Sequence, residues 1–132
     1  MTTFFYLASR FERQAELREL ARLMTWEGYV ITSRWLEAGG LSIGRTPAEA
    51  AACADKDAED VYRAEALVLF TDDNPVSRGG SNVELGMALA WRRRCYVVGP
   101  RVNVFHYYSR VIWIPTLAEF RARFCGGATV GA

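Results

Sequence analysis

A glutamate near the start of a predicted helix is the residue of this sequence best placed to do chemistry. Glu84 follows a loop with two adjacent glycines, Gly79 and Gly80, and its helix is expected to begin with Ser81 as N-cap. Glycine permits positive φ and lets a ligand approach the backbone closely. A glycine-containing loop that leads into a helix N-terminus readily binds an anion such as phosphate. A carboxylate beside such a loop therefore indicates a task beyond phosphate binding.

Each candidate residue also has a purely structural interpretation. Ser81 and Glu84 have the spacing of a capping box, in which the glutamate accepts a hydrogen bond from the N-cap backbone. Asp57 belongs to an acidic helix segment and can be plain solvated charge. Tyr6 lies in an apolar run, where a core role fits as well as a chemical one. The single histidine, His106, can be a surface residue, a dimer contact or a substrate contact, and the surface position is favoured.

The composition is that of one globular domain, expected over residues 1–125 with a flexible tail at 126–132. Of the 132 residues, 51% are hydrophobic and 23% are charged. A chain of this size and composition can form a stable hydrophobic core without disulfides or a structural metal. The net charge of +1 leaves no basic excess for nucleic acid or an anionic membrane. The three cysteines lack zinc-site or disulfide spacing, so neither a metal nor a cofactor is expected. No signal peptide or membrane-spanning apolar run is visible, and the expected location is cytoplasmic.

Apolar runs typical of buried strands alternate with helical patterns along the chain. The strands are expected at 3–8, 29–35, 65–71, 95–98 and 111–114, and the helices at 11–27, 46–63, 81–93 and 116–124. The second helix is expected to begin with Thr46 as N-cap, Pro47 at the first helical position and Glu49 in the first turn. Such alternation favours parallel strands joined by right-handed crossovers. The sequence therefore predicts an α/β fold, a flavodoxin-like three-layer sandwich with a five-stranded parallel sheet in the order 2-1-3-4-5.

This predicted topology also locates a binding site. In such sheets, ligands bind at the carboxyl ends of the strands, where the strand order reverses. The loops that meet there are residues 8–11 and residues 72–80. The fold therefore brings a ligand to the glycine loop and to Glu84, independently of any motif.

Four segments together resemble the nucleoside 2-deoxyribosyltransferase family, which includes relatives that hydrolyse nucleoside 5′-monophosphates. The segments are residues 5–8, Asp57 with residues 61–65, residues 80–88 and residues 98–106, within a span of about residues 4–120. In this family a glutamate attacks C1′ of the sugar, an aspartate handles the base and a tyrosine orients the nucleophile. The resemblance assigns these catalytic roles to Glu84, Asp57 and Tyr6. The C-terminal tail does not match members whose terminus reaches the site.

Further residues are predicted to bind the substrate. The candidates for a 5′-phosphate are Ser9, Arg10, Ser77, Arg78, Gly79 and Gly80. Phe11 and Trp35 are candidate walls for the base, and Asp60, one helical turn from Asp57, ranks below Asp57 as a contact. Asn103 lies in an aromatic segment that is too apolar for a free loop. The resemblance implies that this segment approaches the pocket of a second subunit, in a homodimer or a higher homo-oligomer.

The chemistry that these residues favour is cleavage of an N-glycosidic bond in a nucleoside or its 5′-monophosphate. A carboxylate below C1′ can trap the oxocarbenium-like state, and a second acid can protonate the leaving base. Transfer of the sugar to another base is slightly favoured over hydrolysis. The alternatives are a nucleotide N-hydrolase and a nucleotide-binding module without turnover.

Overall fold

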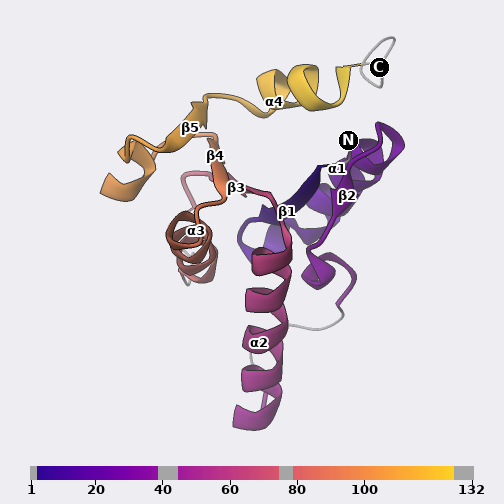
Figure 1. Cartoon of the computed structure of the whole chain (residues 1–132), viewed down its shortest axis with the longest axis vertical. Helices are drawn as coiled ribbons and strands as arrows, with labels where there is room; N and C mark the ends of the chain where they lie inside the picture. The colour runs from indigo at the N-terminus through magenta and orange to yellow at the C-terminus, as the bar shows by residue number, and fades with distance from the viewer. Residues whose placement is uncertain (1–2, 39–44, 75–78, 127–132) are drawn as a thin grey trace.

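A computed structural model describes residues 3–38, 45–74 and 79–126 of the chain. The strands form one parallel sheet in the order β2-β1-β3-β4-β5, which confirms the predicted flavodoxin-like arrangement (Figure 1). The strands are β1 (Phe4–Ala8), β2 (Val30–Ile31), β3 (Ala66–Phe70), β4 (Arg94–Val98) and β5 (Val111–Ile114). The α-helices are α1 (Gln14–Trp26), α2 (Pro47–Arg63), α3 (Gly80–Ala90) and α4 (Leu117–Phe124). Three 3₁₀ turns are η1 (Phe11–Arg13), η2 (Arg34–Glu37) and η3 (Val104–Tyr107).

The sheet is covered on both faces, because alternate strand residues point to opposite sides. One core includes Phe5, Leu7, Val68, Phe70, Leu17, Leu20, Met24 and Phe120, from the sheet, α1 and α4. The other includes Tyr6, Leu67, Leu69, Val97, Val61, Leu85, Ala88 and Leu89, from the sheet, α2 and α3. The Tyr6 side chain belongs to the second of these cores, so it points toward the layer that contains α2 and α3.

The second strand is shorter than the predicted 29–35, because side chains replace its backbone pairing after Thr32, whose N–H still donates to the carbonyl of Phe5. The backbone N–H of Leu7 donates to Oγ of Ser33 rather than to a strand carbonyl. The N–H of Arg34 donates to Oδ2 of Asp60, and the chain then turns into η2. Side-chain oxygens of this kind compete with a sheet ladder for the backbone.

The start of α3 also differs from the prediction. Its N-cap is Gly79, with φ of 85°, and no side chain caps the helix, so the assignment of Ser81 as N-cap is wrong. A residue other than glycine would be strained at this positive φ, because its Cβ would crowd the backbone. By contrast, α2 begins as predicted, with Thr46 and Glu49 forming a capping box and a proline at the first helical position. Within the described part of the chain, none of the helices is both long and apolar enough to cross a membrane.

Candidate active site

The centre of the candidate site is a hydrogen bond between β1 and α3. The Tyr6 side chain is fully buried, and its hydroxyl donates to Oε2 of Glu84 at 2.5 Å. The N3 position of a capping box on Gly79 would be Asn82, two residues before Glu84, so the capping-box interpretation of Glu84 is wrong. Glu84 is instead a partly buried carboxyl held by one phenol, at the α2 and α3 side of the sheet.

Burial controls the protonation of this pair. Desolvation raises the pKa of Glu84 to about 8, the Tyr6 hydrogen bond lowers it, and the charge of Asp57 raises it. Desolvation and the nearby Glu84 charge hold the pKa of Tyr6 well above its ordinary value, so Tyr6 stays a hydrogen-bond donor. The tyrosine therefore orients the carboxyl and stabilises its ionised form.

Asp57, on α2, is the second carboxyl of the site. Burial, followed by the charge of Asp60, raises the pKa of Asp57 to about 6, against the opposing charges of Arg45, Lys56 and Arg34. Its charge also raises the pKa of both Glu84 and Tyr6. Between about pH 6 and pH 8, Glu84 and Asp57 together therefore hold one proton. Two carboxyls that share one proton can serve as one base or nucleophile and one acid.

Asp60 is placed differently from its sequence neighbour Asp57. It is fully buried, and its carboxylate accepts hydrogen bonds from the backbone N–H of Arg34 at 3.0 Å and from its Nε at 2.8 Å. These bonds direct the carboxylate to η2 and away from open space. Asp60 is therefore buried beside the site, whereas the sequence suggested a contact with the substrate.

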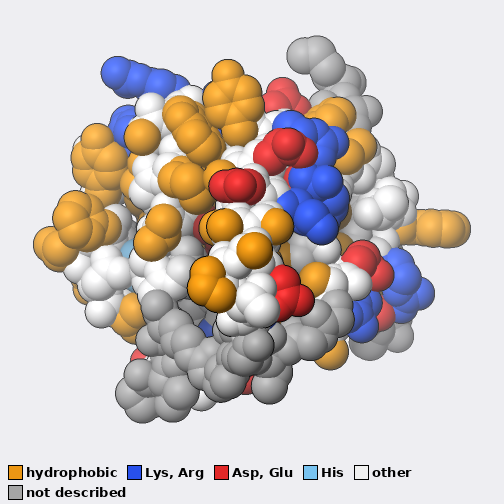
Figure 2. All heavy atoms as spheres, turned by 90° about the horizontal axis from the view of Figure 1, so that it is seen from below, with side chains coloured by type: hydrophobic (Ala, Val, Ile, Leu, Met, Phe, Trp, Pro, Cys, Tyr) orange, Lys and Arg blue, Asp and Glu red, His pale blue; other side chains and the backbone are white. Residues whose placement is uncertain are grey.

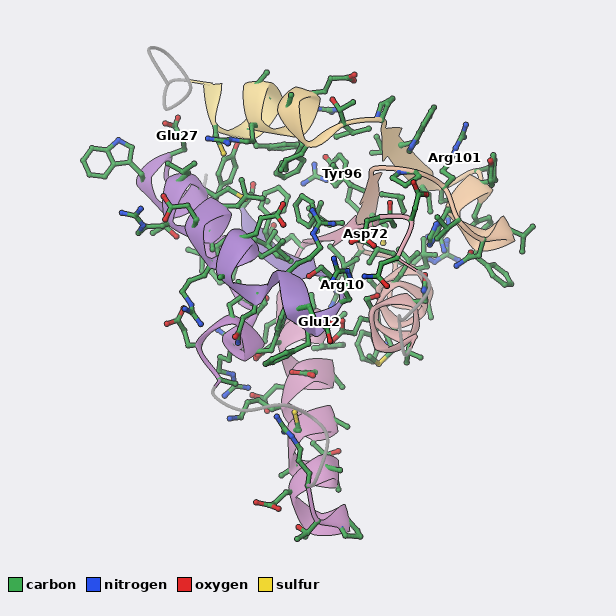
Figure 3. All side chains as sticks on the ribbon, turned by 180° about the vertical axis from the view of Figure 1, so that it is seen from behind. Arg10, Glu12, Glu27, Asp72, Tyr96 and Arg101 are labelled. Atoms are coloured by element: carbon green, nitrogen blue, oxygen red, sulfur yellow. The ribbon has the colours of Figure 1, made fainter. Side chains whose placement is uncertain are left out.

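A cavity of about 310 Å³ opens at the carboxyl end of β3, beside the first turn of α3. Its lining residues are Arg10, Leu69, Thr71, Asp72, Asp73, Asn74, Ser81, Asn82, Val102 and His106. This is the edge of the sheet at which the strand order predicts a ligand. Figure 3 shows Arg10, Glu12 and Asp72 close together in this region.

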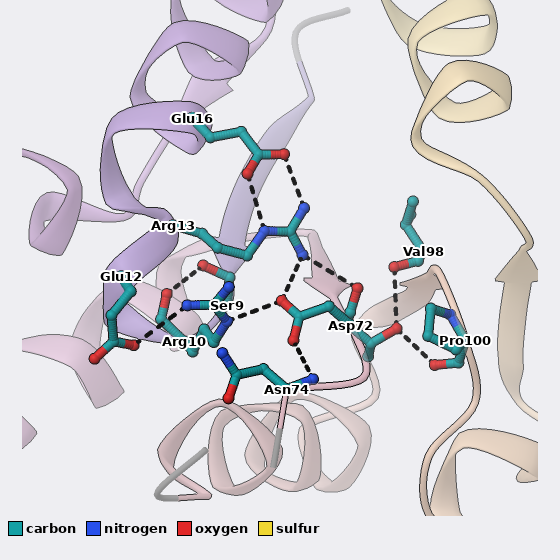
Figure 4. A network of polar contacts seen from close by, with 10 residues as sticks. Ser9, Arg10, Glu12, Arg13, Glu16, Asp72, Asn74, Val98 and Pro100 are labelled. Atoms are coloured by element: carbon teal, nitrogen blue, oxygen red, sulfur yellow. Dashed lines mark hydrogen bonds and ion pairs between the residues drawn. The ribbon is translucent and has the colours of Figure 1, made fainter. Parts of the chain in front are cut away.

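Arginine side chains in this region are held by Asp72 (Figure 4). Arg10 donates from Nε to Oδ2 of Asp72 at 2.9 Å, and Arg13 donates to the carbonyl of Thr71 at 3.1 Å. Arg10 lines the cavity, whereas Ser9 is buried and donates from Oγ to the carbonyl of Arg10. Of the predicted phosphate-binding group, Arg10 and Gly79–Gly80 thus lie at one edge of the sheet, and Ser77 and Arg78 fall outside the described residues.

The two predicted base-binding aromatic side chains lie near each other. The ring centroids of Phe11 and Trp35 are 6.3 Å apart. Trp35 is anchored because its indole N–H donates to the carbonyl of Leu7 at 2.8 Å. These rings lie next to the end of β1, and neither is among the residues that line the cavity described above.

A polar cluster of Asn82, Asn103 and His106 joins α3 to the segment after β4. His106 is only 1% exposed, so its interpretation as a surface residue is wrong. Its Nδ1 accepts from the backbone N–H of Val102 at 3.1 Å, and its Nε2 lies 2.8 Å from Oδ1 of Asn82. Asn103 also donates to Asn82. These partners assign the proton of a neutral His106 to Nε2, in keeping with a pKa that burial lowers.

Asn82 is a residue of this region that was not predicted from the sequence. The one feature of the sequence that could have indicated a role for Asn82 was its position, two residues before Glu84 in the first turn of the helix. Its role depends on His106, 24 residues away, and only the tertiary structure brings the two together. Among the described residues, no group of three or more His, Cys, Asp or Glu side chains could hold a metal ion.

Comparison with known proteins identifies a likeness in structure and not in sequence. No protein-family model matches the chain, and no curated protein matches it. Among solved structures, it is similar to the CMP N-glycosidase BcmB of Clostridium botulinum, with 18% sequence identity and a TM-score of 0.61. The match covers 89% of this chain and 92% of that one. The chain therefore shares its fold with this N-glycosidase along most of its length.

Proposed function

We propose that this protein cleaves the N-glycosidic bond of a nucleoside 5′-monophosphate or nucleoside, with Glu84 as the nucleophile. The observation that carries the proposal is the hydrogen bond from the buried Tyr6 to the partly buried Glu84, with Asp57 near enough for its charge to act on both groups. The likeness to a CMP N-glycosidase supports a nucleotide as substrate.

In the proposed reaction, ionised Glu84 attacks C1′ of the sugar, and a glycosyl ester forms as the C1′–N bond breaks. The electron pair of the broken bond goes to the base, which takes a proton from Asp57. Water or a second base then attacks C1′, returns a proton to Asp57 and releases Glu84. Tyr6 holds the attacking oxygen in line by its hydrogen bond.

The molecule that accepts the sugar from Glu84 is either water or a second base. The sequence slightly favours transfer to a second base, whereas the name of the structural neighbour favours water. Incubation with a panel of nucleosides and 5′-monophosphates, with chromatography of the products, tests both branches. We expect free base from at least one substrate. With a second base added, a new nucleoside or nucleotide in excess over free sugar would indicate a transferase, and unchanged release of sugar or sugar phosphate would indicate a hydrolase.

A binding module that kept the pocket without turnover is the alternative from another class. Such a module has no need to bury a carboxyl against a tyrosine, since burial of Glu84 costs free energy when it ionises. Nucleotide binding without release of base from any member of the panel would favour that alternative.

The reaction should depend on pH through the two carboxyls. The reactive form has Glu84 ionised and Asp57 protonated, and their pKa values of about 8 and about 6 make it a minor form, about 1% of the total. We expect kcat/KM to be bell-shaped, with limbs near pH 6 and pH 8. Tyr6→Phe removes a bond that lowers the pKa of Glu84, so the alkaline limb should move to higher pH. An unchanged limb would exclude Tyr6 as the group that orients and tunes Glu84.

A phosphate requirement can be tested at Arg10, which lines the cavity. Arg10→Ala should weaken nucleotide binding about ten- to a hundredfold and leave nucleoside binding nearly unchanged, because a charge-assisted contact contributes roughly 1.5–3 kcal/mol. Arg13→Ala is the matched control, since Arg13 also pairs with Asp72 but does not line the cavity. Calorimetry with a nucleoside and its monophosphate makes the comparison. Equal losses for both ligands would assign Arg10 a structural role.

The segment after β4 also supports the proposal of a homodimer. Its exposed apolar side chains include Val102, Val104, Phe105, Tyr107 and Tyr108, and Ile112 and Trp113 of β5 are exposed as well. Hydrophobic side chains gather on the left of Figure 2, the side on which the orange turn before β5 lies in Figure 1.

We expect a dimer at micromolar concentration by light scattering, and a monomer when Phe105 and Val104 are both replaced by serine. These side chains are 68% and 74% exposed, so the substitution should leave the fold of the subunit intact. Trp26→Ser is the control, because Trp26 is 85% exposed on a different element, α1. A wild-type protein that is monomeric throughout would contradict the dimer.

A further inference from the structure

Next to Asp57 on α2, the buried Asp60 forms an ion pair with Arg34. The proposed reaction does not use this pair directly. Asp60 follows Asp57 by three residues on α2, so the two carboxyls share one side of the helix. Asp60 is fully buried, and Arg34 contributes both a backbone N–H and its guanidinium, with Nη2 2.8 Å from Oδ1. Arg63 adds a second guanidinium at 3.5 Å.

These contacts hold the Asp60 carboxylate in place between two guanidinium groups and a backbone N–H. A buried carboxylate is retained in charged form when cations and N–H groups surround it with good geometry. Arg34 is itself half exposed at the surface, but its backbone N–H and Nε are committed to Asp60. The hydroxyl of Thr32 donates to the Asp60 carbonyl at 2.8 Å, which further ties α2 to the segment after β2.

We propose that Asp60 is a positioning residue for the reaction: its buried carboxylate, held by Arg34 one helical turn from Asp57, favours the form in which Asp57 carries the proton that it delivers to the leaving base. This inference rests on the proposed function only for the task assigned to Asp57. The same hydrogen bonds fix the start of η2, and therefore the place of Trp35, which follows Arg34 directly.

The charges around Asp57 support this assignment. From α2, Asp60 raises the pKa of Asp57 and Lys56 lowers it, while Arg45 before α2 and Arg34 of η2 also lower it. Glu84 of α3 and Tyr6 of β1 face the same region and couple to Asp57. After burial, Asp60 makes the largest contribution, and it opposes three cations. Removal of its charge also leaves Arg34 without compensation, so both changes move the pKa of Asp57 downward.

The test is the variant Asp60→Asn, with the Asp57 carboxyl followed by ¹³C NMR during a pH titration without substrate. Asp57→Asn assigns the signal. We expect the midpoint of Asp57 to fall by about one pH unit. The acid limb of kcat/KM should fall by the same interval, and the maximum should fall about tenfold, because a smaller fraction then has Asp57 protonated beside ionised Glu84. A merely structural role for Asp60 would not move the Asp57 titration.

Glu59→Gln is the matched control. Glu59 precedes Asp60 on α2 and contacts the same Arg34 guanidinium at 2.7 Å, but its side chain is 63% exposed. This variant should leave the midpoint of Asp57 in place. If Asp60→Asn does not fold, the double change Asp60→Ala with Arg34→Met removes both charges together, and the Asp57 midpoint should still fall because the Asp60 contribution exceeds that of Arg34.

A midpoint of Asp57 that stays unchanged in a folded variant without the Asp60 charge would overturn the inference. Equal shifts in Asp60→Asn and Glu59→Gln would also overturn it, because the effect would then not be specific to the buried carboxylate. The NMR titration needs no turnover. Failure of the proposed function, seen as no release of base by the wild-type protein, is therefore distinguishable from failure of this coupling.

Discussion

Replacement of Glu84 by glutamine should remove nearly all release of base, with a loss of roughly 10⁴–10⁶-fold in kcat. Glutamine keeps the size of the side chain and can still accept the hydrogen bond from Tyr6, but it cannot attack C1′ as an anion. The measurement is initial release of base by chromatography at pH 7. Substrate binding by calorimetry should stay within a few fold of the wild-type value, since the shape of the pocket is unchanged.

Stability separates this chemical effect from a folding defect. The pKa of Glu84 is raised from 4.5 to about 8 in the folded protein, so the group favours folding at low pH and this contribution is lost as the pH rises from about 4.5 to about 8. Glutamine never ionises. Glu84→Gln should therefore melt near the wild-type temperature at pH 5 and above it at pH 9. Wild-type turnover by this variant would remove Glu84 as the nucleophile.

Replacement of Asp57 by asparagine should lower kcat about 10²–10⁴-fold, which is the usual contribution of a general acid. Asparagine can hydrogen-bond to the base but cannot hand over a proton. The size of the loss should depend on the leaving group, because a base that is already cationic departs as a neutral molecule. Rates for an ordinary nucleotide and for one with a cationic base give this comparison directly.

Asp55→Asn is the control for this experiment, since Asp55 lies two residues earlier on α2 and is exposed. It should keep wild-type rates with both substrates. If Asp57→Asn loses as much activity on the cationic base as on the ordinary one, Asp57 does not act as the acid. Its role would then be limited to binding.

Local patterns in the sequence were enough to predict the fold. The alternation of apolar runs and helices predicted the five parallel strands, and the topology predicted a ligand site at the carboxyl end of β3, where a cavity lies. Thr46, Pro47 and Glu49 marked the start of α2 correctly, because a capping box is formed by residues that are neighbours in the chain. At Ser81 and Glu84 the same local rule failed, since the positive φ of Gly79 moved the helix start two residues earlier.

The protonation states and partners of the site were decided only by the tertiary structure. Asp57 and Asp60 look alike as acidic residues on one helix, yet only Asp60 meets Arg34 and becomes fully buried. Tyr6 reaches Glu84 across 78 positions of sequence, and His106 reaches Asn82 across 24. The sequence by itself determined the elements and their order along the chain, because these follow from interactions between near neighbours, and the family resemblance selected Glu84 as the candidate nucleophile. Burial and hydrogen-bond partners depend on which distant segments pack together, and they determine which carboxyl carries the proton.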